Sequence, residues 1–152
     1  MNKNINIIEI GIDELMEDDA VLVEEARKAV ELSYSPYSNF SVGAAALLDN
    51  GKIVRGANQE NVSYPVGICA ERSTIYTAQN LYPNVPVLSI ALAAKGRDGE
   101  FTKDYVTPCG MCRQAISELE NRYQRQIRIL MCSAHKVAIV DTINSLLPMS
   151  FI

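Results

Sequence analysis

The sequence predicts a three-layer α/β/α domain, in which helices cover both faces of a mixed β-sheet. Two observations carry this prediction. Two strand-like runs within residues 40–58 flank Asn50-Gly51, a dipeptide that tolerates the positive φ angles of a tight turn, so the sheet should open with an antiparallel hairpin. Further on, largely apolar runs at residues 85–95 and 127–134, which read as buried strands, alternate with helix-like segments, and this is typical of parallel strands crossed by helices.

The chain has 152 residues, the size of one ordinary domain. Residues 1–17 contain a short apolar segment followed by acidic residues, and we interpret them as an N-terminal extension that could dock on a sheet edge or at an oligomer interface. Residues 18–152 are predicted to form one catalytic domain. It should begin with a helix, since apolar residues follow Asp18 at helical spacing and either Asp18 or Asp19 could cap it.

Two more helices are predicted, at residues 69–81 and 109–122, and each begins at a cysteine that follows an apolar strand or a loop. The strand at residues 85–95 separates them, and the strand at 127–134 follows the second. After the hairpin, strands are therefore expected to keep alternating with helices.

Composition excludes several classes of partner. The formal net charge is −4 and the pI is near 5.0, which argues against a nucleic acid polymer because phosphate binding needs a positive surface. The sequence has no apolar run long enough to cross a membrane and no secretory leader, so we expect a cytoplasmic protein without a membrane partner. In a reducing compartment the four cysteines are expected to be metal ligands, catalytic groups or buried apolar residues.

Three of these cysteines have the positions of metal ligands. Cys109 and Cys112 lie three residues apart on one predicted helical turn, so their sulfurs can point the same way. Helix N-termini favour thiolates, because unpaired N–H groups and the positive end of the helix dipole lie there. Cys69 begins the other helix and is the natural third ligand of a catalytic zinc, which keeps three protein ligands and one open position.

Glu71 lies two residues after Cys69, inside the first turn of its helix, where it could reach the open position without binding the metal. This is the place for a general acid–base. Zinc deaminases share the pattern of a histidine or cysteine, x-Glu, and then Pro-Cys-x-x-Cys. The segments "CAE" and "PCGMC" fill that pattern.

Other interpretations of the cysteines remain. A redox pair at Cys109 and Cys112 would leave Cys69 and Glu71 unexplained. A structural zinc site needs a fourth ligand, for which Cys132 and His135 are the candidates. Cys132, however, lies in an apolar run typical of a buried inert cysteine, and His135 fits the surface end of a strand.

The sequence resembles the small, homotetrameric cytidine deaminases that act on free nucleosides. The resemblance extends over residues 20–152 and rests on "PYSNFSVGAAALL", "GANQENVSYPVGICAER", "PCGMCRQAISEL" and the terminal "LLPMSFI". The chain departs from the family pattern in its N-terminal extension, at Ala57, at Met111 and in a longer stretch between residues 95 and 104. Of these, Met111 and the longer stretch affect the expected shape of the loop around the metal.

The resemblance implies a cytidine deaminase-like fold and the hydrolytic deamination of cytidine and 2′-deoxycytidine to uridine and 2′-deoxyuridine, with release of ammonia. Such a reaction belongs to pyrimidine salvage. It implies one Zn²⁺ per chain and a homotetramer with sites shared between subunits. The implied site residues are zinc ligands Cys69, Cys109 and Cys112; the proton carrier Glu71; ribose-binding Asn58 and Glu60; Tyr64 in the same pocket; Phe40 against the pyrimidine; Phe151 closing over the base of an adjacent subunit; and Arg72, hydrogen-bonded to the ligand sulfurs.

Several alternatives stay open. Phe40, Tyr64 and Phe151 also fit ordinary packed aromatics, and the polar residues also fit loop or surface positions. A deaminase of a related nucleoside such as blasticidin S could share the cysteine motifs, although Asn58 and Glu60 favour a plain ribose. A deaminase of polynucleotides is disfavoured by the acidic charge, and one of nucleoside monophosphates by cysteine in the first ligand position. From another class, a zinc-stabilised binding module without turnover would carry the same ligands.

Overall fold

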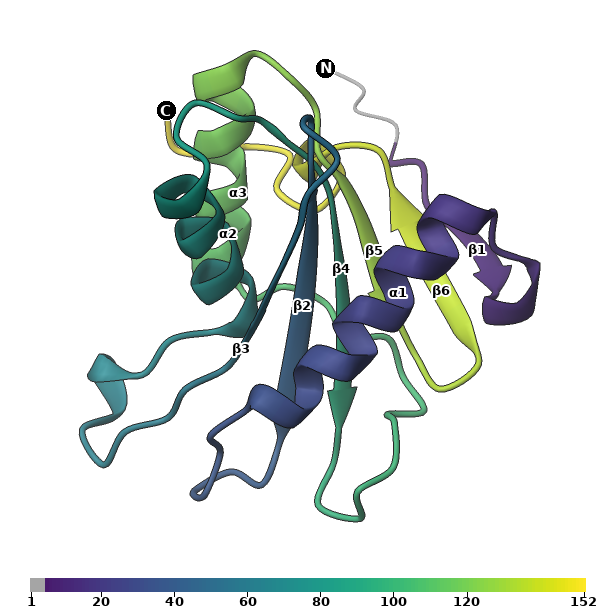
Figure 1. Ribbon diagram of the computed structural model, residues 1–152, viewed down its shortest axis with the longest axis vertical. Coiled ribbons are helices and arrows are strands. Elements are labelled where there is room, and N and C mark those ends of the chain that lie inside the picture. Colours follow the sequence, from purple (N-terminus) through teal and green to yellow (C-terminus); the bar gives the residue numbers. More distant parts are fainter. Residues whose placement is uncertain (1–4) are drawn as a thin grey trace.

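The computed structural model describes residues 5–152, which form three layers around one six-stranded sheet (Figure 1). The strands lie in the order β1-β6-β5-β4-β2-β3 across the sheet. Their bounds are β1 Ile8–Gly11, β2 Ser41–Leu48, β3 Ile53–Ala57, β4 Val87–Lys95, β5 Arg128–Cys132 and β6 Lys136–Val140. The predicted layered α/β fold with a mixed sheet is confirmed.

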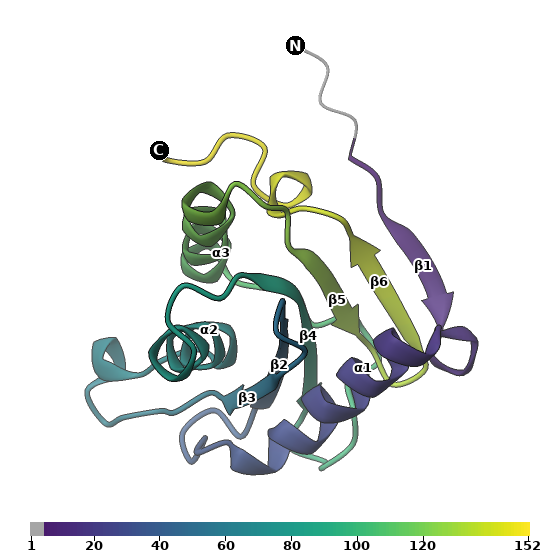
Figure 2. The same cartoon turned by 45° about the horizontal axis from the view of Figure 1, so that its top comes forward.

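Helix α1 (Glu17–Ala29) covers one face of the sheet, and α2 (Ala70–Leu81) and α3 (Gly110–Tyr123) cover the other (Figure 2). Each face has its own apolar cluster, since residues that alternate along the strands point to opposite sides. In the described part of the chain, four short 3-10 helices complete the elements: η1 Ile12–Glu14, η2 Val30–Leu32, η3 Tyr64–Val66 and η4 Ile143–Ser145. Within residues 5–152, no helix combines the length and apolar character needed to cross a bilayer.

The leading hairpin is confirmed. Strands β2 and β3 pair antiparallel around the Asn50-Gly51 turn, where the Gly51 N–H donates to the Leu48 carbonyl at 2.9 Å. Gly51 has a φ of +80°, a value that glycine adopts without steric cost. Asn50 does not have a positive φ; its side chain accepts a hydrogen bond from the Lys52 N–H at 3.0 Å.

Only one strand pair in the described sheet is parallel, β4 with β5, and α3 lies in the crossover between them. The expectation that strands keep alternating with helices is wrong after β5. Residues 133–135 form a short turn, and β6 returns antiparallel to β5. Such a turn can join only antiparallel neighbours, because a parallel connection needs a dozen residues or more.

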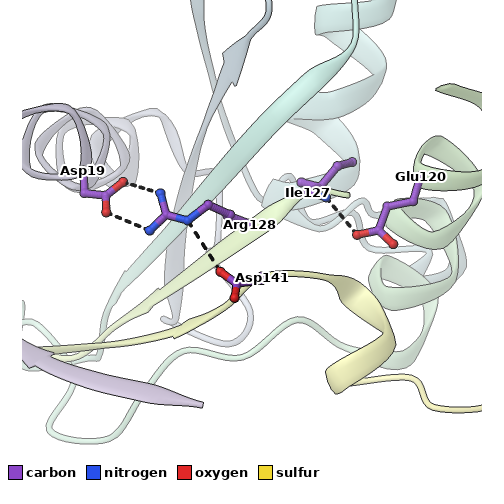
Figure 3. A network of polar contacts seen from close by, with 5 residues as sticks. All are labelled: Asp19, Glu120, Ile127, Arg128 and Asp141. Atoms are coloured by element: carbon purple, nitrogen blue, oxygen red, sulfur yellow. Dashed lines mark hydrogen bonds and ion pairs between the residues drawn. The ribbon is translucent and has the colours of Figure 1, made fainter. Parts of the chain in front are cut away.

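The start of α1 also differs from the prediction. The helix begins at Glu17, and its N-cap is Met16, whose side chain makes no capping hydrogen bond. Asp19 instead accepts two hydrogen bonds from the Arg128 guanidinium, at 2.8 and 2.9 Å, and so ties α1 to β5 (Figure 3). The acidic residues in the first turn still lie at the positive end of the helix dipole.

Part of the N-terminal extension forms an edge strand. Strand β1 pairs antiparallel with β6, and Glu9 accepts hydrogen bonds from Lys136 at 2.7 Å and from the Tyr105 hydroxyl. Of the two locations considered for the extension, the structure shows the sheet edge. Residues 1–4 lie outside the described part of the chain, and the domain division at residue 17 stays a prediction.

Candidate active site

The sequence brings three thiols to the N-termini of α2 and α3. Cys69 is the N-cap of α2 and Cys109 is the N-cap of α3, both with extended backbone, and Cys112 lies in the first turn of α3. Gly56 lets α2 approach β3 closely, because a Cβ there would lie 2.5 Å from the Thr74 Oγ1. The two predicted helix starts are thus confirmed to within one residue.

The thiols form a cluster suited to zinc. The Cys69 and Cys109 sulfurs are 3.7 Å apart, those of Cys109 and Cys112 are 3.6 Å apart, and all three lie within 4.8 Å of one another. Zinc–sulfur bonds of about 2.3 Å in a tetrahedron place neighbouring sulfurs about 3.8 Å apart. The cluster therefore fits one zinc ion bound by three thiolates.

The protons of these thiols are shared unequally. A hydrogen bond from Cys112 lowers the pKa of Cys69 to about 5, and Arg72 and Cys109 lower it further against the effect of burial. The same hydrogen bond, together with burial, raises the pKa of Cys112. At least one sulfur is therefore anionic near neutral pH, as a cation site requires.

Arg72 supplies positive charge beside the cluster. Its Nη2 donates to the Cys69 sulfur at 3.6 Å, and this bond is the main reason that the pKa of Arg72 is raised. Its Nε is buried without a hydrogen-bond partner in residues 5–152. A guanidinium in this place can draw charge from the sulfurs once they hold a metal.

Glu71 is the buried acid of the site. Its side chain is 4% exposed, in the first turn of α2 between the two ligand-bearing helix ends. Burial raises the pKa of Glu71, and the nearby Cys69 charge adds to the rise, while its own backbone N–H and the Cys112 thiol oppose it. A carboxyl group with a raised pKa exchanges protons more readily near neutral pH.

The cluster opens into a cleft of about 770 Å³. Most of the predicted site residues line it: Phe40, Asn58, Glu60, Tyr64, Cys69, Glu71, Arg72 and Cys109. Cys112 is fully buried behind this wall, and Phe151 lies outside the cleft of its own chain. The structure thus gathers eight of the ten predicted residues on one cavity.

Asn58 and Glu60 are both held by the chain. The Asn58 carbonyl oxygen accepts from the Ser33 hydroxyl at 2.5 Å and from the Val42 N–H at 2.9 Å, and its amide donates to the Phe40 carbonyl at 2.9 Å. The Glu60 carboxylate accepts from the backbone N–H groups of residues 37 and 38, at 3.0 and 3.1 Å. Hydrogen bonding to Ser38 lowers the pKa of Glu60, so the carboxylate is an anionic acceptor at the cleft.

The aromatic residues differ in exposure. Phe40 is 40% exposed on the cleft wall, and Tyr64 is 75% exposed with its ring edge-to-face with that of Tyr37, 6.0 Å between centroids. Phe151 is 85% exposed, although its main chain is hydrogen-bonded to α3. None of the three is an ordinary core aromatic.

Sequence reasoning missed several lining residues. The backbone N–H groups of residues 37 and 38, which bond the Glu60 carboxylate, lie in the quoted "PYSNF" block. A contact made by the main chain does not depend on residue type, so the sequence does not reveal it. Val106 and Thr107 line the cleft just before the Cys109 loop, and Met111 lines it just after. Met111 is 64% exposed, so this departure from the family pattern alters the rim and not the ligand set.

The alternative fourth ligands lie elsewhere. Cys132 is 1% exposed in the cluster beneath α1, and burial raises its pKa to about 12. His135 is exposed in the β5–β6 turn. Among the described residues the only candidate metal cluster is the three thiols, which leaves the open position of a catalytic site.

Comparison with known proteins points the same way. A family model described as "Cytidine and deoxycytidylate deaminase zinc-binding region" matches residues 16–126. A curated cytidine deaminase of Halalkalibacterium halodurans is 44% identical over 102 residues, which cover 67% of this chain and 72% of the relative. One of Sporosarcina psychrophila is 42% identical over 100 residues, covering 66% and 68%.

Solved structures agree with the fold. The crystal structure of a cytidine deaminase from Burkholderia pseudomallei superposes with a TM-score of 0.74 and 31% identity, covering 90% of this chain and 100% of that one. That of Mycobacterium tuberculosis gives a TM-score of 0.70 and 32% identity, covering 89% and 98%.

Proposed function

The chain belongs to the family of cytidine and deoxycytidylate deaminases, and on that premise we propose that it catalyses the zinc-dependent hydrolysis of cytidine and 2′-deoxycytidine to uridine and 2′-deoxyuridine. Ammonia is the second product. One observation carries the proposal: three clustered thiols and a buried carboxyl group meet at the end of a cleft of about 770 Å³. A pocket of this size suits a nucleoside.

Cys69, Cys109 and Cys112 would hold the zinc ion, which when bound supplies a water that ionises near neutral pH. Glu71 accepts a proton from the attacking water and delivers it to ring N3 of the base. Once the hydroxide has added to C4, Glu71 takes the proton of the new C4 hydroxyl and passes it to the amino group, which leaves as ammonia while the C4 carbonyl of uridine forms. One buried group can serve each transfer because it lies beside the cluster without belonging to it.

The substrate contacts are proposals of the same kind. The Glu60 carboxylate and the remaining N–H of Asn58 would bind the ribose hydroxyls, with Tyr64 beside them. Phe40 would pack against the pyrimidine. Phe151 would close over the base in an adjacent subunit of a homotetramer, and the exposure of its ring in its own chain supports that location. A cytoplasmic role in pyrimidine salvage is the corresponding biological proposal.

Loss of the ultraviolet absorbance of cytidine on addition of purified, zinc-loaded protein tests the function directly. Turnover of cytidine and deoxycytidine is expected, with little activity on free cytosine, because the site is built around hydroxyl groups. Faster turnover of blasticidin S would support the related-nucleoside alternative. Zinc binding without any turnover would support the binding-module alternative and overturn the proposal.

A further inference from the structure

The C-terminal tail, residues 141–152, follows β6 and returns to α3. Both views show the C-terminus beside that helix (Figures 1 and 2). Three polar side chains of α3 hold it: Arg113, Gln114 and Glu120. Arg113 and Gln114 belong to the "PCGMCRQ" motif, and the proposed chemistry assigns no role to either.

Glu120 fixes the beginning of the tail. Its carboxylate accepts from the Thr142 hydroxyl at 2.8 Å and from the Ile143 N–H at 3.0 Å. The side chain is 8% exposed, so these bonds are shielded from water. The path of the tail is therefore set where it leaves the sheet.

Arg113 fixes the middle of the tail and joins it to the metal-ligand loop. Its Nη1 donates to the Leu146 carbonyl at 2.7 Å, and its Nε donates to the Pro108 carbonyl at 2.8 Å. Pro108 directly precedes Cys109. One guanidinium thus holds the loop of the candidate metal site and the tail in register with each other.

Gln114 fixes the end of the tail. Its Nε2 donates to the Phe151 carbonyl at 2.8 Å, and its Oε1 accepts from the Phe151 N–H at 3.3 Å. The Gln114 amide therefore bonds both the N–H and the carbonyl of Phe151 and makes no hydrogen bond with its side chain. The Phe151 ring is 85% exposed, so the backbone is held while the ring projects away from its own chain.

We propose that Gln114 is a positioning residue that presents the Phe151 ring, already oriented, to the cleft of a second copy of this chain. The proposal rests on the proposed function, in which that ring closes over a bound nucleoside. A segment that is ordered before docking loses less conformational entropy when it docks. Gln114 would therefore act on substrate affinity through Phe151, with no contact to the substrate.

The test is a double-mutant cycle on cytidine turnover with Gln114→Ala, Phe151→Ala and the double variant, each normalised to zinc content. Gln114→Ala is expected to raise KM by roughly three- to tenfold, the effect of freeing one ordered segment, with a smaller change in kcat. In the Phe151→Ala background the same substitution should change KM less than twofold, because the ring through which it acts is gone. Gln79→Ala is the matched control, since the Gln79 amide, on α2, bonds the Val85 carbonyl and the Tyr123 hydroxyl, neither of which belongs to the tail.

Equal effects of Gln114→Ala in both backgrounds would overturn the proposal. A KM for cytidine that is unchanged in Phe151→Ala would also overturn the proposal. In that case, turnover of cytidine by the parent protein would still support the deaminase function. The subunit origin is tested by co-refolding Glu71→Gln with Phe151→Ala chains. In mixed oligomers, the intact Glu71 of a Phe151→Ala chain can meet the intact Phe151 ring of a Glu71→Gln chain, so activity with a lower KM should return. If no such activity returns, the ring acts within its own chain, and the proposal that it acts on a second copy is overturned.

Discussion

Glu71 and Glu120 are both buried glutamates, on neighbouring helices over the same face of the sheet, yet their surroundings differ. The Glu120 carboxylate accepts three hydrogen bonds. One comes from the backbone N–H of Ile127 (Figure 3), one from the backbone N–H of Ile143 and one from the Thr142 hydroxyl. The hydrogen bonds that act on the pKa of Glu71 come from its own backbone N–H and from the Cys112 thiol, and the charges of Cys69 and Arg72 act on it as well.

This difference separates Glu120, a carboxylate suited to a structural role, from Glu71, a carboxyl group suited to proton transfer. A buried anion is stable where donors replace its lost hydration, and Glu120 has them. Glu71 lacks such a set, so burial raises its pKa, and it faces a cleft where a water could come. A buried acid left short of donors is poised to exchange a proton, whereas a fully paired one serves to hold segments together.

Substituting Glu71→Gln should give the largest effect. The amide keeps the volume of the side chain but cannot carry a proton, so kcat for cytidine should fall by at least a factor of about 10²–10⁴. Zinc should stay at the parent level, because the proposed ligands are Cys69, Cys109 and Cys112, which could hold the ion without Glu71. A stopped assay of cytidine turnover gives kcat, and metal analysis of the same sample gives the zinc bound per chain. Loss of zinc would make Glu71 a ligand, and unchanged turnover would leave the mechanism without its proton carrier.

The two glutamates also show how far sequence carries the interpretation. Glu71 stands two residues after Cys69, and local spacing with "PCGMC" was enough to predict its place, as it was for the helix starts at Cys69 and Cys109. Glu120 lies seven residues before Ile127 and more than twenty before Ile143. Nothing in its helical neighbourhood marks it as buried and triply bonded.

The same limit explains the other misses. Strand β6 is short, and it pairs with β1, which lies more than 120 residues earlier in the chain. The position of β6 in the sheet therefore depends on long-range contacts, which a local sequence pattern does not show. The Glu60 carboxylate is held by main-chain groups more than twenty residues away. The tail's attachment to α3 through Gln114 likewise spans 37 residues. The placement of the thiol cluster and of Glu71, which depends on residue type and spacing, was predictable, and contacts made by the folded backbone were not.

Glu120→Ala should give the next largest effect, on stability and not on chemistry. It leaves the buried N–H groups of Ile127 and Ile143 without their acceptor, which should cost about 2–5 kcal/mol of unfolding free energy. Urea denaturation measures this, and the exposed Glu118→Ala on the same helix is the control. At saturating cytidine, kcat per zinc-loaded folded chain should stay within about threefold of the parent, since Glu120 lies outside the cleft and its hold on the tail would act on KM. A kcat loss on the scale of Glu71→Gln would end the distinction between the two acids.

A smaller effect is expected at one donor of the Glu120 set. Thr142→Val removes the hydroxyl that bonds the carboxylate while keeping the branched shape, and Thr142→Ser keeps the hydroxyl. The valine variant should be less stable than the serine variant by about 1–2 kcal/mol, because it loses the bond to the Glu120 carboxylate and the bond that the hydroxyl accepts from the Asn144 N–H. Urea midpoints of the two variants give the comparison. Equal midpoints would mean that the two backbone donors alone satisfy Glu120.

The smallest effect is expected at Asp19, whose carboxylate pairs with Arg128 on the opposite face of the sheet (Figure 3). The pair is bidentate, but the Arg128 side chain is 42% exposed, and exposed ion pairs contribute about 1 kcal/mol or less. Asp19→Asn should therefore lower the unfolding free energy by no more than about 1 kcal/mol, and the difference from the parent should shrink at high salt because solvent-exposed charges are screened. Urea denaturation of both proteins in low and high sodium chloride measures it. A salt-independent loss as large as that of Glu120→Ala would show that access to water does not govern what a carboxylate contributes here.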